Sequence, residues 1–385
     1  MRFVVPVAVL VALPALRACT QNVTTDNASA DGPIAVTSTD SGCEVAADSA
    51  PAGPLTFQVT NSGSKVTEFY LYSADGEQIV GEVENIGPGL QGKLIVTAEQ
   101  GSYLTACRPG MSGLGLRADF TVTKATDAAA APSRDQALVR RAQDDYRAWV
   151  QRQADVLVAR TARFVAAYRS GDDARARALY PVARTPWERI ETVAESFGDL
   201  DPQTDAREAD LAEGQSWTGW HRIEKDLWPA RAHRYTPLTP AQRKVYGADL
   251  LAHVTEVRDR IGGLTFTTDQ IANGSSGLME EVATSKVTGE EEYWSHTDLW
   301  DFAANVEGAR VAFDDVRPIL ERRDPGLATT LAARFDELER LLARHHDGGG
   351  YVVYTELTRT HVKRLADAVN ALAEPLSHLT AAVLP

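Results

Sequence analysis

A histidine and a glutamate three residues apart, His221 and Glu224, are the pair in this sequence best suited to hold a metal ion. On a helix this spacing puts both side chains on one face, about one turn apart, where they can reach the same ion. An imidazole and a carboxylate together suit divalent iron, zinc or manganese. Apolar neighbours predict that this turn is partly buried: Trp217, Trp220, Ile223, Leu227 and Trp228. A buried charged pair needs a partner or an ion, whereas an exposed pair would simply be solvated.

Acidic residues that could complete such a site occur in two other segments. Glu188 and Glu191 share one helix face, which could bind the same ion or could be a solvated face. The second segment covers residues 290–301 and contains Asp298 at the expected start of a helix. Acids at that place could also serve only to favour the helix N-terminus.

A third group of candidate ligands lies in the N-terminal half: Cys43, Glu68 and Cys107. Two thiolates and a carboxylate could hold copper or iron. Further candidate ligands follow in the same half: Glu82, Glu84 and Met111. In an oxidising compartment the two cysteines would instead form a disulfide. A blue-copper site is not expected, because it needs two imidazoles and no histidine precedes His221.

The two halves that must position these residues differ in hydrophobic period. Between about Ile34 and Thr123, short runs alternate apolar and polar residues and are separated by Gly-, Asn- and Pro-containing turns, which predicts a β-sandwich. Beyond the Ala-rich linker, apolar residues recur at three- and four-residue steps, which predicts an all-α bundle. The expected helices include 146–168, 241–261, 299–320, 327–344 and 355–372.

The N-terminus has the pattern of an export signal. Arg2 precedes an apolar run, Phe3 to Leu16, that is too short to span a bilayer as a helix. The Ala18-Cys19 step resembles the lipobox of bacterial lipoproteins and would make Cys19 a lipidated first residue, although Arg17 departs from that pattern and leaves plain secretion as the alternative. We therefore expect an extracytoplasmic protein, anchored by lipid at the membrane surface. Its expected parts are a signal peptide (1–18), a tether (19–33), a β domain (34–124), a linker (125–134) and a helical domain (135–385).

Composition narrows the class of partner. The chain has 385 residues, of which 44% are hydrophobic, and a formal net charge of −14. That hydrophobic fraction is sufficient for two packed cores. The negative charge argues against a nucleic-acid partner, because binding to phosphates needs basic patches. An acidic surface suits a protein that handles cations, and it also serves solubility.

Several motifs resemble known families, in order along the chain. The runs 59–69 and 101–111 resemble the cupredoxin fold, and Gly219-x-His221-x-x-Glu224 looks like the Gly-x-His-x-x-Glu motif of imelysin-like proteins. The stretches 187–191, 195–202 and 295–308 are similar to EfeO-type proteins of bacterial iron-uptake systems. Those proteins also join a cupredoxin-like domain to an imelysin-like one.

The resemblance implies a fold and a function. It implies a cupredoxin-like β-sandwich followed by an imelysin-like domain of two four-helix bundles, with the metal site between helices. The protein would capture iron, ferrous or ferric, and deliver it to an EfeU-like membrane permease that works with an EfeB-like haem peroxidase. The alternative is an imelysin-like zinc metallopeptidase. The zincin His-Glu-x-x-His arrangement is absent, however, and Glu224 would have to act as both ligand and base.

The resemblance also implies a set of metal ligands. In the helical domain these are His221, Glu224, Glu188, Glu191 and Asp298. In the cupredoxin-like domain they are Cys43, Glu68 and Cys107, where copper or zinc are further candidate metals and ferrous iron could be oxidised.

Overall fold

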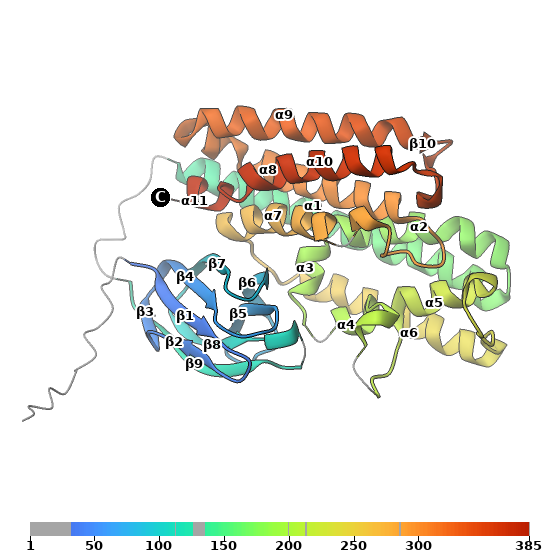
Figure 1. The fold of residues 1–385 in the computed structure, drawn as a ribbon, viewed down its shortest axis with the longest axis horizontal. Helices are drawn as coiled ribbons and strands as arrows, with labels where there is room; N and C mark the ends of the chain where they lie inside the picture. The colour runs from blue at the N-terminus through green and yellow to red at the C-terminus, as the bar shows by residue number, and fades with distance from the viewer. Residues whose placement is uncertain are drawn as a thin grey trace, which may run out of the picture.

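The computed structural model describes residues 32–111, 113–125, 135–198, 200–211, 214–284 and 286–384. Within these ranges a β-sandwich precedes a helical domain, and Figure 1 shows the sandwich beside the end of the helical domain that carries α3 and α7. The predicted signal peptide, Cys19 and the segment 126–134 lie outside the described residues. No helix among the described residues combines the length and the apolarity that a membrane span needs.

Two sheets form the sandwich, in the strand orders β2-β1-β4-β7 and β3-β9-β8-β5-β6. Alternation along β4 turns Leu55, Phe57 and Val59 into the core, as the sequence pattern predicts. The ring of Phe57 packs 5.1 Å from Phe69 and 5.5 Å from Phe120, which joins the two sheets. The strands are β1 (Ile34–Ser38), β2 (Cys43–Val45), β3 (Ser49–Pro51), β4 (Gly53–Asn61), β5 (Thr67–Ser73), β6 (Ile79–Ile86), β7 (Gln91–Ala98), β8 (Gly101–Cys107) and β9 (Leu116–Thr123).

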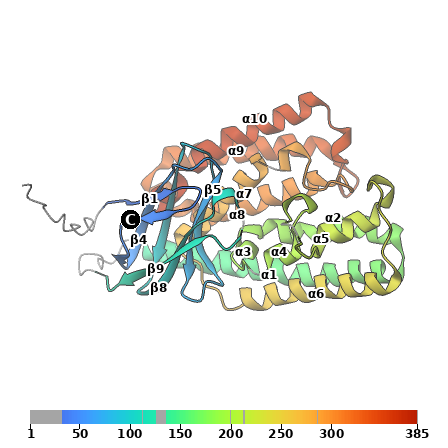
Figure 2. The same cartoon turned by 60° about the horizontal axis from the view of Figure 1, so that its bottom comes forward.

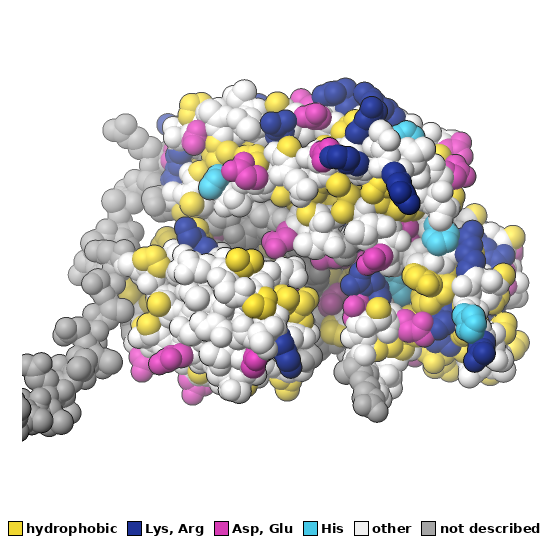
Figure 3. Space-filling view, viewed as in Figure 1, with side chains coloured by type: hydrophobic (Ala, Val, Ile, Leu, Met, Phe, Trp, Pro, Cys, Tyr) yellow, Lys and Arg dark blue, Asp and Glu magenta, His cyan; other side chains and the backbone are white. Residues whose placement is uncertain are grey.

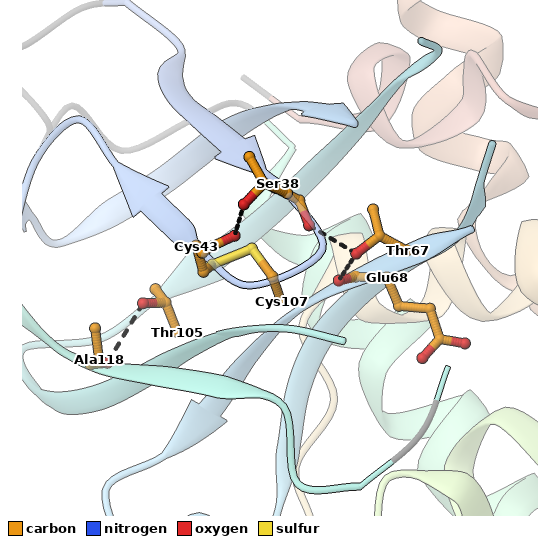
Figure 4. The surroundings of a disulfide bond; sticks show 9 residues. Ser38, Cys43, Thr67, Glu68, Thr105, Cys107 and Ala118 are labelled. Atoms are coloured by element: carbon orange, nitrogen blue, oxygen red, sulfur yellow. Dashed lines mark hydrogen bonds between the residues drawn. A yellow bond between two sulfur atoms is a disulfide. The ribbon is translucent and has the colours of Figure 1, made fainter. Parts of the chain in front are cut away.

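Cys43 of β2 and Cys107 of β8 form a disulfide that ties one sheet to the other (Figure 4). Oxidised sulfurs are not thiolates, so this bond replaces the thiolate ligands expected at the two cysteines. Glu68 is also separated from them, because its neighbour Phe69 lies opposite Cys107 in the β5–β8 register and successive side chains leave opposite faces of a strand. Its side chain points away from the disulfide in Figure 4. The three residues therefore do not meet at one site in this structure.

Replacing both Cys43 and Cys107 by alanine is expected to lower the free energy of unfolding of the β domain by about 4 kcal/mol, because the bond closes a loop with a sequence separation of 64 residues. Hydrogen exchange of β4 and β7 peptides in increasing urea would measure the loss. All seven tryptophans lie in the helical domain, so their fluorescence is an internal control. Unchanged protection of both strands would contradict the prediction.

The helical domain consists of two helix bundles, which contact each other where α8 packs against α1 and α2. Helices α7, α8, α9 and α10 pack as one bundle (Figure 1), and α1, α2 and α6 pack with the short α5 as the other (Figure 2). The helices expected from the period are confirmed as α1, α6, α8, α9 and α10. Their ends are displaced by up to four residues, except that α1 begins ten residues before residue 146. The elements are α1 (Gln136–Ser170), α2 (Asp173–Arg189), α3 (Glu191–Glu195), α4 (Asp201–Thr204), α5 (Gly219–Leu227), α6 (Pro240–Ile261), α7 (Thr268–Thr284), α8 (Asp298–Arg323), α9 (Pro325–Leu342), α10 (Arg359–Leu376) and α11 (Leu379–Val383), with a short hairpin β10 (His346–Asp347) and β11 (Gly350–Tyr351).

Direct hydrogen bonds join the two domains. The Thr97 N–H donates to the Asp269 carboxylate (2.6 Å), and Asn273 Nδ2 donates to the Ile95 carbonyl (2.8 Å). At the edge strand β6, the Ile79 N–H donates to the Ser196 carbonyl (2.9 Å). Beside these contacts a cleft of about 470 Å³ opens between β6 and β7 on one side and α3 and α7 on the other. Figure 3 shows the hollow between the two domains. Its lining includes five carboxylates: Glu82, Glu84, Glu191, Glu280 and Glu281.

Candidate metal centre

Helix α5 carries His221 and Glu224 into the interior of the domain. It begins at Gly219, whose φ of +85° belongs to the left-handed region that glycine adopts without strain. A Cβ at this position would overlap the Thr204 carbonyl of α4, so glycine also permits the close approach of the two helices. Trp220 and Ile223 are fully buried, as the sequence predicts, and the intervening polar face of the helix is buried with them.

His221 faces carboxylates on both sides of its ring. Nδ1 lies 3.4 Å from Glu224 Oε2, and Nε2 lies 3.4 Å from both Asp205 Oδ1 and Glu291 Oε1. These distances are long for hydrogen bonds, and Nε2 has no hydrogen-bond partner among the described residues. Ligand atoms of His221, Glu224 and Glu292 also lie within 4.8 Å of one another. The ring is therefore surrounded by the oxygen donors that a shared cation would need.

A second group of carboxylates adjoins the first. Ligand atoms of Glu188, Glu191 and Asp205 lie within 4.8 Å of one another, and Asp205 belongs to both groups. Glu188 lies in the last turn of α2, and Glu191 is the first residue of α3. The kink between these helices turns both side chains inward. Asn305 Nδ2 on α8 donates to Glu191 Oε2 at 2.8 Å and holds that carboxylate in place.

Arg184 lies at the centre of the cluster and is fully buried. Its Nη2 is 2.5 Å from Glu188 Oε1 and its Nε is 2.8 Å from Glu292 Oε1. Further ion pairs join it to Asp205, Glu291 and Asp301. The carboxylates nevertheless outnumber the buried bases, which are Arg184, Lys286 and His221. The acids are Glu188, Glu191, Asp205, Glu224, Glu291, Glu292, Asp298 and Asp301.

This crowding shifts the pKa values of the cluster. Burial and the Arg184 charge oppose protonation of His221, but contacts with Glu224, Glu291 and Asp205 outweigh them and raise its pKa to about 10. Burial, together with the neighbouring Glu224 charge, raises the pKa of Glu292 well above its usual range. His221 and Glu292 therefore hold protons that an incoming cation would displace.

Of the residues predicted from sequence, the structure brings His221, Glu224, Glu188 and Glu191 into this cluster. Asp298 is buried nearby but belongs to none of the three groups whose ligand atoms lie within 4.8 Å of one another. Its Oδ1 accepts the Glu292 N–H at 3.0 Å, so it supports the chain that carries Glu292. Burial raises the pKa of Asp298 to about 6.

Three residues of the groups that could hold an ion are absent from the predicted ligands: Asp205, Glu291 and Glu292. Glu291 and Glu292 lie in the acidic segment 290–301, but three consecutive glutamates have no period that tells which of them faces inward. Asp205 directly follows the single turn of α4, where no sequence period exists.

Comparison with known proteins gives consistent matches over both domains. Residues 142–379 match the imelysin family, and residues 6–118 match the cupredoxin-like domain family. The iron uptake system component EfeO of Yersinia pestis is 37% identical over 350 residues, which cover 90% of each chain. EfeO of Yersinia pseudotuberculosis serotype I is 36% identical over 97% of this chain and 95% of its own. EfeO of Escherichia coli K12 is 35% identical over 90% of each chain.

Proposed function

This chain belongs to the imelysin family, among the EfeO-type proteins of bacterial iron uptake, and on that premise we propose that it binds an iron ion at His221 and Glu224 for delivery to a membrane permease. One observation carries the proposal. The buried His221 ring lies between Glu224 on one side and Asp205 and Glu291 on the other, and Nε2 has no hydrogen-bond partner among the described residues. Nitrogen and carboxylate donors in this arrangement suit ferrous iron, and the surplus of carboxylates also suits ferric iron.

The proposal assigns the ion to the helical domain and leaves the cupredoxin-like domain without a thiolate site. With Cys43 and Cys107 oxidised, Glu68 is the remaining predicted ligand there. Its Oε2 accepts a hydrogen bond from the Tyr70 hydroxyl at 2.7 Å and lies 3.2 Å from Arg108 Nη1, so an internal cation already neutralises it. Copper and zinc thus have less support than iron as cargo.

We further propose that the chain works outside the cytoplasmic membrane, held there by a lipid on Cys19. The predicted export signal and the role of the relatives in iron uptake support this location. Its expected partners are an EfeU-like permease, which would receive the ion, and an EfeB-like haem peroxidase. Metabolic labelling with a palmitate analogue, compared with Cys19→Ala, tests the anchor: equal labelling of the two would contradict it.

Burial argues against the alternative of a zinc metallopeptidase. His221 is 1% exposed, and Glu224 and Glu292 are fully buried, so a peptide chain has no access to an ion held between them. Glu224 Oε1 also accepts backbone N–H groups of Trp294 and Ser295, which fixes the carboxylate that would have to act as the general base. Release of peptides from casein in the presence of zinc, abolished by His221→Ala, would support the peptidase instead.

Calorimetric titration with ferrous iron in the absence of oxygen tests the binding function. The wild type is expected to show saturable binding, and His221→Ala to weaken it by roughly 100-fold, equivalent to about 3 kcal/mol, because it removes the only nitrogen donor of the cluster. His346→Ala is the matched control, since His346 is exposed on the β10 strand. Absence of binding to the wild type, or equal binding to the two variants, would refute the proposed function.

A further inference from the structure

Lys286 supplies a buried ammonium to the cluster at a defined position. It begins a single 3-10 turn, Lys286–Thr288, that follows α7. Its Nζ lies 2.8 Å from Glu188 Oε2 and 2.6 Å from Glu191 Oε2, and the residue has no solvent exposure. Both partners are carboxylates of the second three-residue group, where a cation could bind. The positive charge of Lys286 therefore neutralises the same two carboxylates, Glu188 and Glu191, that a bound metal ion would neutralise.

The two buried cations of the cluster differ in how firmly they are held. Arg184 projects from within α2, and its planar guanidinium contacts five carboxylates. The Lys286 ammonium pairs with the carboxylates of Glu188 and Glu191, and the charges of Glu291 and Glu281 also attract it. An ammonium on a flexible four-carbon stem is also easier to withdraw than a fixed guanidinium. Lys286 is thus the cation that can leave while the rest of the cluster stays in place.

Glu191 connects this ammonium to the cleft between the domains. Its side chain lines the cleft together with Glu84 of β6 and Glu281 of α7, and its Oε2 holds Lys286 Nζ on the inner side. The carboxylates of the cleft attract cations from solvent. A metal ion that enters between the domains can therefore reach Glu191, and behind Glu191 it meets the positive charge of Lys286.

We propose that Lys286 is an exchangeable counter-cation that determines the iron affinity of the cluster. In the protein without bound iron, its ammonium neutralises Glu191 and shares the neutralisation of Glu188 with Arg184, because a buried carboxylate without a cation is costly. A metal ion entering from the cleft replaces it, because an ammonium and a divalent ion a few ångströms apart repel strongly at the low dielectric of the interior. The displaced ammonium turns into the cleft, and its return favours release of the ion. This inference rests on the proposed function, since it requires that the cluster load iron.

Reactivity of the lysines in the unaltered chain tests the exchange directly. Acetylation with a water-soluble amine reagent, read by mass spectrometry, is compared without metal and with saturating ferrous iron in the absence of oxygen. Lys286 is expected to be protected in the ion-free protein and to react at least about tenfold faster when iron is bound. The side chain of Lys363 is 74% exposed and is the internal reference in both states. Protection of Lys286 in both states overturns the inference.

The variant Lys286→Met tests its effect on affinity, because it keeps most of the unbranched side chain and removes the charge. Ferrous iron is expected to bind about tenfold more tightly to this variant, since the ammonium no longer competes for Glu188 and Glu191. Lys363→Met is the matched control and should bind iron like the wild type. An affinity of Lys286→Met equal to that of the wild type, or weaker, also overturns the inference.

The two proposals fail in distinguishable ways. A wild type that binds no ferrous iron overturns the proposed function and this inference together. A wild type that binds iron through His221 while Lys286 stays protected overturns this inference alone. The lysine reactivity is measured on the unaltered chain and decides the question even where Lys286→Met does not fold.

Discussion

Arg184→Met is expected to lower the free energy of unfolding by about 4 kcal/mol, because it leaves several buried carboxylates without a cation. The guanidinium is fully buried and pairs with Glu188 and Glu292, which are fully buried themselves, so neither acid can turn to water when it is lost. Urea unfolding monitored by tryptophan fluorescence measures the loss. Trp187 and Trp220 are buried within the same domain and report on its unfolding.

An exposed arginine provides the comparison for this variant. Arg317 pairs with Glu321 at 2.8 Å, but both side chains are exposed, so Arg317→Met should cost less than about 1 kcal/mol. Equal losses in the two variants would contradict a central role for Arg184.

The loss of unfolding free energy caused by Arg184→Met should also depend on pH. Burial already raises the pKa values of Glu292 and Asp301 well above their usual range, and loss of the guanidinium raises them further. An acid whose pKa is higher in the folded state stabilises the fold while it is protonated and loses that contribution as pH rises. The variant should therefore lie closer to the wild type at about pH 5 than at about pH 8. A deficit that grows on acidification would contradict this account.

Gly219→Ala is expected to lower the free energy of unfolding by about 4 kcal/mol and to weaken iron binding with it. The left-handed φ of +85° is strained for alanine, and the added Cβ would overlap the Thr204 carbonyl, which is backbone and cannot turn aside. Because His221 is two residues further on, any shift of the helix start moves the ring away from Asp205. Thermal unfolding and iron titration of the same sample measure both losses.

Gly171 offers a control that separates the cost of backbone strain at a left-handed φ from the cost of a Cβ that overlaps a neighbouring helix. It also has a left-handed φ, +80°, but a Cβ there would meet nothing within 4 Å. Gly171→Ala should thus cost only about 1 kcal/mol, from backbone strain alone. If Gly219→Ala costs no more than Gly171→Ala, the close approach of α5 to α4 is not what the glycine of the motif provides.

Local sequence patterns predicted the two domains and their longest elements, because helical and strand periods depend only on near neighbours. They did not predict α7, whose Asn273-Gly274-Ser275-Ser276-Gly277 run lowers helix propensity. The structure shows why small residues occur there: a Cβ on Gly274 would lie 3.2 Å from Thr192 Oγ1, so α7 needs them to pack closely against α3. Tertiary packing compensates for poor local propensity at this helix.

Tertiary packing likewise limits what the sequence predicts about the candidate metal centre. His221 and Glu224 were predictable because three residues on a helix fix their relation. Asp205, Glu291 and Glu292 reach the ring from separate segments, and only the packing of α4 and of the loop before α8 brings them together. Glu68 stays a predicted ligand, but its relation to Cys107 could not be read from the sequence. The register of β5 and β8 places Phe69 opposite Cys107, so the pleat sends the Glu68 side chain to the other face of the sheet.

The contact between Ile79 and Ser196 has a consequence for the solubility of the protein. Strand β6 is the edge of the five-stranded sheet, and an uncovered edge presents free N–H and C=O groups on which a second chain can add a strand. In this chain the segment after α3 covers the start of that edge, through the Ile79–Ser196 hydrogen bond and the bridge between Gln78 and Phe197. The helical domain thus covers the start of this edge, and the surface that borders the acidic cleft also hinders a second molecule from adding a strand there.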